Sequence, residues 1–397
     1  MRPTRDAAAA VRRNLALLIV PTLLLTVIGL VMVLSAGSIS AIEGYDNSFW
    51  YFNRQSLYAV AGLVVLVVAA RVPHTVWRRA AIPALVAVVP LMLLTLHPSI
   101  GSSLYGAARW IDLGPITLQP AELAKPFVLF AAAAIVTRPW KDVTRGRELL
   151  LPLGPIVAVV AGVVLLQRDL GTTLIICGSV FLLLFVAGAR PRHLFVAALG
   201  GALVTAYFIF GTAYRRTRLM ESWLRWELDP SGAGWQLQQG LIALGSGGWF
   251  GVGLGNSRQK WEYLPNAHSD FVFAILGEEL GLAGALFVLA LFGALLYAGI
   301  RIAVSAPDPF GRLLAAGVTG WIGLQTIVNL GAVTGLLPIT GVPLPFLSFG
   351  GTALVVTLGG VGVVASVALA GLRTGRRRVE RRRTRRPATA GAGRPSR

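Results

Sequence analysis

Three polar residues, His268-Ser269-Asp270, stand directly before a long apolar segment that begins at Phe271. The loop before them carries further ionisable side chains, among them Glu262. Charged side chains are costly to hold near lipid, so a cluster of them where a loop meets an apolar segment indicates a functional site. A carboxylate within hydrogen-bond reach of a hydroxyl group can act as its general base. Asp270 and Glu262 are therefore the candidates for acid–base chemistry, although Asp270 could also serve only as the N-cap of the helix that follows.

Two basic residues further upstream are candidates for binding an anion. The pair Gln119-Pro120 is typical of a helix start, and it places Glu122 and Lys125 three residues apart on one helix face. Two interpretations stay open. Either Lys125 forms a structural ion pair with Glu122 inside the membrane, or it presents a positive charge to an anionic substrate together with Arg109.

A tight turn and a long loop hold further polar candidates. Asp169 lies in the turn 167–171, where it either caps the next helix or contributes to a site. The loop 211–269 opens with arginines and aromatic residues mixed at helical spacing, including Arg215 and Arg218, which is typical of a helix in the lipid headgroup region. The same arginines could bind phosphate groups.

The later part of this loop combines a short helix with glycines. Residues 236–244 favour a helix, and the glycines between positions 245 and 255 allow two backbones to approach closely. These glycines match neither a P-loop nor a dinucleotide-binding pattern, so they predict no nucleotide site.

Two downstream segments are expected to support the site. Glu278 and Glu279 lie about 12 Å into the following helix at 1.5 Å per residue, and we interpret them as mainly structural, holding this helix against its neighbours. The segment 337–352, rich in proline and glycine, predicts a broken re-entry at membrane depth. Such backbone is tolerated only inside protein or beside a cavity, so it should form one wall of the site.

The elements that position these residues are membrane spans. Of the 397 residues, 55% are hydrophobic and only 13% are charged, with mean hydropathy +0.69, whereas a soluble domain has about 25% charged residues. The fold class is therefore an all-α polytopic membrane protein. About ten stretches approach the length of roughly 20 apolar residues that a spanning helix needs. They are 15–37, 55–71, 78–97, 121–138, 150–167, 170–189, 193–211, 270–300, 310–335 and 347–372.

The basic residues predict how these spans are oriented. If both termini are cytoplasmic, every short loop on the inner side carries at least two basic residues. By contrast, the outer linker 98–120 carries one basic residue, Arg109, and the outer linker 336–346 carries none. This asymmetry follows the positive-inside rule. It predicts a cytoplasmic N-terminus at 1–14, a membrane domain at 15–372 and an extracytoplasmic loop, 211–269, between spans 7 and 8.

The remaining parts of the chain predict no soluble module. The tail 373–397 contains blocks of arginine and then Pro, Gly, Ala and Ser, so we expect it to be disordered and cytoplasmic. It would anchor to anionic membrane lipids or dock a cytoplasmic partner, and without a folded module we expect no nucleic-acid partner. The apolar run near residues 15–34 is too long for a signal peptide, and the single Cys177 excludes an internal disulfide.

Four blocks of the chain resemble the SEDS family (shape, elongation, division and sporulation), whose members polymerise cell-wall glycan. The likeness covers about 15–372, and the motifs in 256–265 are closer to the FtsW division branch than to the RodA elongation branch. The blocks are 106–125, 167–172, 253–281 and 337–352. The chain departs from the family pattern at Ala121, Arg168, Asn266, Ser269 and Phe349; Arg168 adds a cation beside Asp169.

The resemblance implies a substrate, partners and roles for residues. The substrate would be lipid II, and the partners would be a class B penicillin-binding transpeptidase and other divisome proteins, at a septum in the bacterial cell membrane. The essential aspartate and loop glutamate of the family match Asp270 and Glu262. The residues that we expect to bind substrate are Arg109, Lys125, Asp169, Arg215, Arg218, Gln259, Lys260, His268 and Ser348. No organic cofactor is expected; a divalent cation, Mg²⁺ or Mn²⁺, could assist.

The implied reaction replaces a diphosphate leaving group by a sugar hydroxyl with inversion. Asp270 would be the base, and cations would stabilise the leaving group. The competing functions are a transporter of the lipid-linked precursor, an elongation polymerase of the RodA type, and a catalytically silent scaffold. Against transport, the ionisable groups gather at one face and no inverted repeat is visible.

Overall fold

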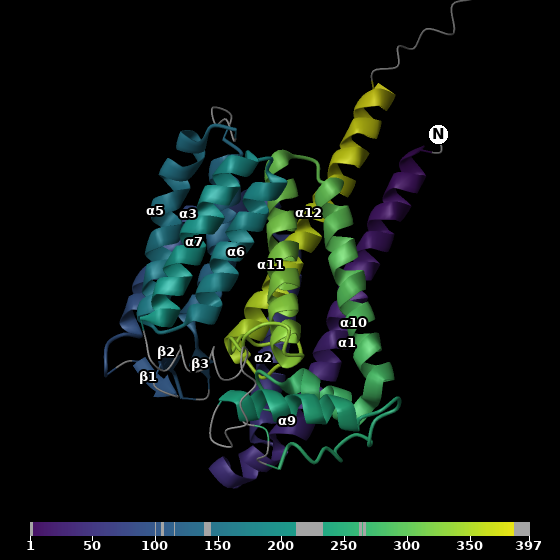
Figure 1. The fold of residues 1–397 in the computed structure, drawn as a ribbon. Coiled ribbons are helices and arrows are strands. Elements are labelled where there is room, and N and C mark those ends of the chain that lie inside the picture. Colours follow the sequence, from purple (N-terminus) through teal and green to yellow (C-terminus); the bar gives the residue numbers. More distant parts are fainter. Residues whose placement is uncertain are drawn as a thin grey trace, which may run out of the picture.

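The computed structural model is a bundle of long helices with a small sheet and a crosswise helix at one end (Figure 1). It describes residues 3–99, 101–104, 107–114, 116–138, 144–211, 233–261, 264 and 267–384. The helices are α1 (Pro3–Tyr45), α2 (Trp50–Arg71), α3 (His74–Leu94), α4 (Pro120–Val136), α5 (Gly146–Leu166), α6 (Leu170–Val186), α7 (Pro191–Phe210), α9 (Ala233–Ser246), α10 (Val272–Val304), α11 (Pro309–Val333) and α12 (Gly351–Thr384).

Each of the ten segments that the sequence predicts to span the membrane coincides with one of these helices, which confirms the all-α polytopic fold class. Within the described ranges, eight helices are long and apolar enough to cross a membrane. The other two, α4 and α6, have 17 residues each. The N-terminus and the end of α12 lie at the same end of the bundle (Figure 1), in agreement with an even number of spans. The cytoplasmic location of both ends stays a prediction.

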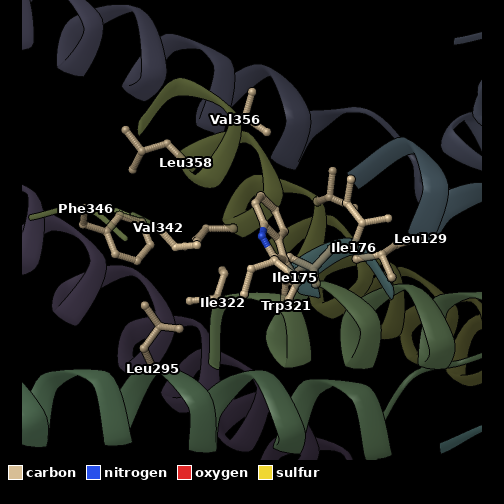
Figure 2. Packing of buried hydrophobic residues seen from close by; sticks show 14 of the residues in the cluster. Leu129, Ile175, Ile176, Leu295, Trp321, Ile322, Val342, Phe346, Val356 and Leu358 are labelled. Atoms are coloured by element: carbon tan, nitrogen blue, oxygen red, sulfur yellow. The ribbon is translucent and has the colours of Figure 1, made fainter. Parts of the chain in front are cut away.

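The helices divide into inner and outer ones. Nearly all of α4 is buried, whereas Leu194 is the one residue of α7 that is buried. Figure 2 shows the indole of Trp321, from α11, among apolar side chains that include Leu129 of α4 and Ile175 and Ile176 of α6. This packing makes α4 an inner helix, so any charge on it must be satisfied by protein groups rather than by water.

A three-stranded antiparallel sheet lies in the linker 98–120, where the sequence predicted no regular structure. Its strands are β1 (Gly101–Leu104), β2 (Ala107–Asp112) and β3 (Thr117–Leu118), in the order β1-β2-β3. The backbone of Thr117 joins it to the bundle: its N–H donates to the Tyr58 hydroxyl of α2 (2.6 Å), and its carbonyl accepts from Thr352 of α12 (3.1 Å). The sheet is thereby fixed against two spans and can hold Arg109 at a defined position.

Helix α9 and a break in α10 shape the end of the bundle that carries the sheet. Helix α9 lies across this end (Figure 1), and it confirms the short helix expected at 236–244. Helix α10 is interrupted at Gly281, which has φ 67° and ψ −168°. The backbone groups freed by this break pair with the glycine-rich segment 248–253: Val252 N–H donates to Glu278 O (3.0 Å) and Leu282 N–H donates to Gly248 O (2.9 Å). The close backbone approach expected of these glycines is confirmed.

The expectation of a disordered tail from Arg373 is wrong for its first part. Helix α12 continues without interruption to Thr384. Arginine, valine and glutamate are acceptable helix formers, and extending an existing helix avoids the cost of nucleation. Residues 385–397 lie outside the described residues.

Candidate active site

Asp270 lies at the start of α10, half-buried, beside the re-entry segment 337–350. The N-cap of α10 is Phe271, so the alternative in which Asp270 only caps the helix is not what the structure has. A Cβ atom added to Gly341 would lie 3.4 Å from Asp270 Oδ2, and Gly341 has φ +70°, a conformation that favours glycine. Glycine here lets the re-entry backbone approach the carboxylate, so the segment that we expect to form one wall of the site does lie beside Asp270.

The side-chain amide of Asn329 holds the backbone at this point. Its Nδ2 donates to the carbonyl of Asp270 (2.9 Å) and to the carbonyl of Val342 (2.8 Å). Asn329 is 2% exposed, and its Oδ1 has no hydrogen-bond partner among the residues that the structure describes. One inner side chain of α11 therefore ties the residue that carries the carboxylate to the wall beside it.

His268 belongs to an aromatic cluster next to Asp270. Its ring centroid lies 4.3 Å from that of Tyr51 and 5.8 Å from that of Phe349, and its carbonyl accepts from Phe349 N–H (2.9 Å). Burial lowers the pKa of His268 to about 4, because desolvation disfavours the charged ring. The imidazole is therefore neutral at physiological pH and can offer a hydrogen bond, but no positive charge, to a ligand.

Acid should destabilise the wild-type protein more than a His268→Gln variant. An unfolded histidine binds a proton below about pH 6.5, whereas the folded protein holds His268 neutral down to about pH 4. Because the unfolded state binds more protons in this window, the stability that His268 contributes is present above the window and is lost as pH falls through it. Thermal unfolding of both proteins across this range measures the effect. Parallel loss of stability in the two proteins would contradict the buried neutral ring.

The Ser348 hydroxyl accepts a hydrogen bond within the re-entry segment. Ser348 is 4% exposed, and its Oγ accepts from Leu344 N–H (2.8 Å), which closes the turn 344–348. The same turn is held from α2 by Gln55, whose Nε2 donates to Ser348 O (3.1 Å) and whose Oε1 accepts from Gly350 N–H (3.3 Å). The Ser348 hydroxyl therefore has a structural role in this turn, and its predicted contact with substrate stays a prediction.

Arg109 and Asp169 come together, as both were predicted to lie at the site. Arg109 Nη1 lies 3.4 Å from Asp169 Oδ2, and Arg109 Nη2 donates to Arg168 O (2.9 Å). Asp169 caps α6 by accepting from Thr172 N–H (3.0 Å), so the capping interpretation is confirmed. The cap is close to the wall of the site: a Cβ atom on Gly171 would meet the carbonyl of Thr340.

Lys125 occupies a buried network rather than a surface. Lys125 and Glu122 are each 2% exposed, and their charged atoms are 2.7 Å apart. Lys125 Nζ also donates to Gln325 Oε1 (3.2 Å), and Gln325 Nε2 donates to Pro343 O (2.9 Å) in the re-entry segment. Of the two interpretations left open, this geometry favours the structural ion pair, and the predicted contact between Lys125 and substrate stays a prediction.

The loop that follows α9 is fixed by the two glutamates of α10. Glu278 accepts from Ser257 Oγ (2.5 Å) and from Arg258 N–H (2.9 Å). Glu279 accepts from Ser257 N–H (3.4 Å) and from Ser35 Oγ of α1 (2.5 Å). These contacts confirm the structural role predicted for both carboxylates.

The loop residues predicted to bind substrate differ in how they are placed. Lys260 is 8% exposed and its Nζ donates to Gly255 O (2.5 Å), so in this structure it holds its own loop. Gln259 is half-buried, and its Oε1 is buried with no hydrogen-bond partner in the described part of the chain. Glu262, Arg215 and Arg218 lie outside the described residues.

Sequence reasoning missed Asn329 and Gln55. Both are amide side chains on helices that otherwise read as apolar spans, and a polar residue within a span is itself a signal of function or close packing. Their partners are backbone carbonyls and amides from distant segments. Sequence spacing does not reveal such pairings.

Comparisons with known proteins agree with this geometry. The family model described as cell cycle protein, which covers FtsW, RodA and SpoVE, matches residues 15–371. The chain is 40% identical over 347 residues to a probable peptidoglycan glycosyltransferase FtsW of Geobacter metallireducens, covering 86% of this chain and 91% of that protein. It is 40% identical over 351 residues to stage V sporulation protein E of Bacillus subtilis, covering 88% and 96%.

The fold is also similar to that of a solved structure. A chain from a peptidoglycan synthase complex, reported for its coordination of polymerization and crosslinking, superposes with a TM-score of 0.71 at 31% sequence identity, covering 89% of this chain and 96% of that one. The match of the family model extends over most of the chain, and the relatives are matched over nearly their whole length. The chain therefore belongs to the FtsW/RodA/SpoVE family of multi-pass membrane proteins, as its resemblance to the SEDS family implied.

Proposed function

We propose that this protein is a peptidoglycan glycosyltransferase that polymerises lipid II into glycan strands and releases undecaprenyl diphosphate. The observation that carries the proposal is the placement of Asp270, a half-buried carboxylate at the start of α10, against the re-entry segment. A substrate with a polyprenyl tail in the bilayer and a sugar headgroup in water requires a reacting group at such a boundary. The names of the relatives supply the reaction class.

The chemistry assigned to Asp270 is that of a general base. The sugar hydroxyl of the acceptor attacks the anomeric carbon of the donor, a glycosidic bond forms, and the bond from that carbon to the diphosphate breaks. Asp270 takes the hydroxyl proton, because an unassisted hydroxyl is a poor nucleophile. A change from an α-linked donor to a β-linked product needs a single displacement with inversion, so the reaction requires no covalent enzyme intermediate.

Other residues of the site orient the two substrates. The neutral ring of His268 provides a hydrogen-bonding group beside Asp270, and Gln259 has an amide oxygen left free to accept. We assign Arg109, whose side chain is 29% exposed beside Asp169, to an anionic group of the substrate. We assign Glu262 to the acceptor and Arg215 and Arg218 to the diphosphate, by resemblance to the family.

A divalent cation, Mg²⁺ or Mn²⁺, would be held at this site together with the substrate phosphates and not by a cluster of protein ligands. Within the described ranges, no group of three or more His, Cys, Asp or Glu residues could hold a metal ion. Mg²⁺ is usually held by one or two carboxylates together with substrate phosphates, and Glu262 would supply one besides orienting the acceptor, which leaves Asp270 available as the base. When bound, the cation would neutralise charge on the leaving diphosphate.

The expected partner is a class B penicillin-binding transpeptidase, since the similar solved chain belongs to a complex that couples polymerization to crosslinking. Other divisome proteins and septal enrichment follow from the likeness to FtsW proteins. A fluorescent fusion should concentrate at the septum of dividing cells. Uniform labelling of the side wall would instead favour an elongation role of the RodA type.

The direct test of the proposed function is polymerisation of purified lipid II. The purified protein, in detergent and again in vesicles with its transpeptidase, should convert labelled lipid II into a ladder of glycan strands. Vesicles that hold lipid II in one leaflet separate this activity from transport. If lipid II moves between leaflets and no strand forms under any of these conditions, the protein is a transporter and not a polymerase.

Removing the amide that holds Asp270 should slow polymerisation without abolishing folding. Asn329→Ala leaves the carbonyls of Asp270 and Val342 without their donor, so the carboxylate loses its fixed position. A displacement near 1 Å can lower kcat by about 10². The measurement is kcat and KM with lipid II, and we expect the loss mainly in kcat.

The matched control for Asn329 is Thr326, one turn earlier on α11. Thr326 is buried, and among the described residues its hydroxyl bonds only the carbonyl of Ile322 in its own helix. Thr326→Val should keep kcat within a small factor of wild type. An equal loss in both variants would mean that the effect reflects general damage to α11 rather than the position of Asp270.

A further inference from the structure

The segment that pairs with the break in α10 exposes large apolar side chains. Trp249 is 70% exposed and Phe250 is 85% exposed, and Leu254 is 56% exposed a few residues later. Soluble surfaces seldom present adjacent aromatic residues so openly. The mechanism described above does not use any of these side chains.

This segment is fixed in place rather than loose. Leu282 and Ala283 donate to the carbonyls of Gly248 (2.9 Å) and Trp249 (3.1 Å), and Gly253 donates to Glu279 O (3.1 Å). A Cβ atom on Gly251 would collide with the carbonyl of Glu279. The backbone that carries Trp249 and Phe250 is therefore held to α10 on both sides of Gly281.

The part of α10 between the break at Gly281 and Arg301 is about as long as the hydrocarbon layer is thick. Residues 282–300 extend about 28 Å at 1.5 Å per residue, close to the hydrocarbon thickness of about 30 Å. Arg301 lies in the last turn. With Arg301 taken at one surface of the hydrocarbon, the other surface falls near the break at Gly281, on the side of the bundle that carries Asp270.

The exposed aromatic residues continue the lipid-facing surface of α10. Leu282, Leu286 and Leu289 are spaced by four and three residues, on one face of the helix, and are 44%, 52% and 39% exposed. Trp249 adjoins the Gly281 end of this face, because its carbonyl accepts from Ala283 N–H and the carbonyl of Gly248 accepts from Leu282 N–H, and Phe250 is the next residue in the chain. Tryptophan and other aromatic residues favour the interface between hydrocarbon and water.

We propose that Trp249 and Phe250 insert into the headgroup region of the outer leaflet and anchor the Gly281 junction at the membrane surface. Its occupant is lipid, because the patch is continuous with the lipid-facing stripe of a spanning helix. The purpose of the anchor rests on the proposed function: Asp270, at the start of the same helix, is held at a constant depth relative to the headgroup of a membrane-bound substrate.

The test measures depth and not turnover. A nitroxide spin label is attached to Phe250→Cys in a Cys177→Ala background, with the full chain in vesicles of phosphatidylethanolamine and phosphatidylglycerol. Leu286→Cys supplies the lipid reference and Asn47→Cys, exposed between α1 and α2, supplies the water reference. Collision of the label with oxygen, which dissolves in lipid, is compared with collision with a water-soluble nickel complex.

We expect the ratio of oxygen to nickel collisions at position 250 to exceed that at position 47 several-fold and to approach that at position 286. A ratio equal to that at position 47 would show that residue 250 lies in water and would overturn the proposal of a membrane anchor. Low collision rates with both reagents would show a covering protein surface, such as a second copy, and would also overturn it. Trp249→Cys provides a second label position if Phe250→Cys fails to fold.

The outcome is independent of the enzymatic proposal. If the label inserts into the membrane but the protein never polymerises lipid II, the anchor proposal holds and the proposed function is wrong. A water-exposed label in an active polymerase would do the reverse. The two failures are therefore distinguishable with one preparation.

Discussion

Asp270→Asn protein should polymerise lipid II about 10² to 10⁴ times more slowly than wild type while remaining folded. The substitution preserves the shape of the side chain and removes its ability to accept a proton. The contact that Asn329 makes is to the Asp270 carbonyl, which the substitution leaves unchanged. The assay is the rate of glycan-strand formation from purified lipid II, with thermal unfolding as the check on folding.

Asp308 supplies the matched control. It also stands at a helix start, where it caps α11 through Gly311 N–H (2.9 Å), and it accepts a hydrogen bond from His74, which holds its pKa below the usual range. It lies at the far end of α10 from Asp270. Asp308→Asn should therefore leave the polymerisation rate near that of wild type. Full activity in folded Asp270→Asn protein would remove Asp270 from catalysis, and an equal loss in both variants would make the effect nonspecific.

Lys125→Met should destabilise the protein by about 3–5 kcal/mol, since it leaves the Glu122 carboxylate buried without its partner. Both side chains are 2% exposed, and Glu122 Oε2 already lacks a hydrogen-bond partner in the described part of the chain. The same change deprives Gln325 of one donor. The measurement is the free energy of unfolding, or the shift in unfolding temperature, of the protein in one fixed detergent.

The double variant Glu122→Gln/Lys125→Met separates the two interpretations of Lys125. Removing both charges abolishes the unpaired buried carboxylate, so most of the lost stability should return. Polymerisation should return with it if the pair is structural. If instead Lys125 binds the diphosphate, the double variant would be stable and would still show a raised KM for lipid II.

Hydropathy predicted the spans well because lipid leaves the backbone little choice. A segment in hydrocarbon must satisfy its own amides and carbonyls, so an apolar stretch of sufficient length becomes a helix. The sheet at 101–118 was not predicted, because its strands are short and depend on contacts with other segments. Its strands have 4, 6 and 2 residues, too few to show an alternating pattern, and they are stabilised by pairing with each other and with Tyr58.

The sequence predicted those site residues whose type is unusual at their position. It did not predict residues whose role depends on which other side chains or backbone groups they contact. Asp270 stood out as a carboxylate at a membrane boundary, and the glycine- and proline-rich re-entry stood out as its wall. The substrate roles of Lys125 and Ser348 stay predictions, and the sequence did not reveal the protein partners of either side chain: Lys125 also donates to Gln325 on α11, and the Ser348 hydroxyl accepts from Leu344 N–H within its own turn. Asn329 was missed although its amide fixes the wall to Asp270, since one polar residue in a span does not reveal which backbone groups it meets.

The junction between Gly251 and Gly281 limits how this chain can vary. A Cβ atom on either glycine would fall within about 2–2.7 Å of backbone atoms of the other segment, closer than nonbonded carbon atoms pack at about 3.5–4.0 Å. Because the obstructing atoms belong to the main chain, no second substitution nearby can make room. Inhibitor-resistance mutations selected in this protein should therefore avoid both positions, and a compound that recognises this junction would meet a surface with few routes of escape.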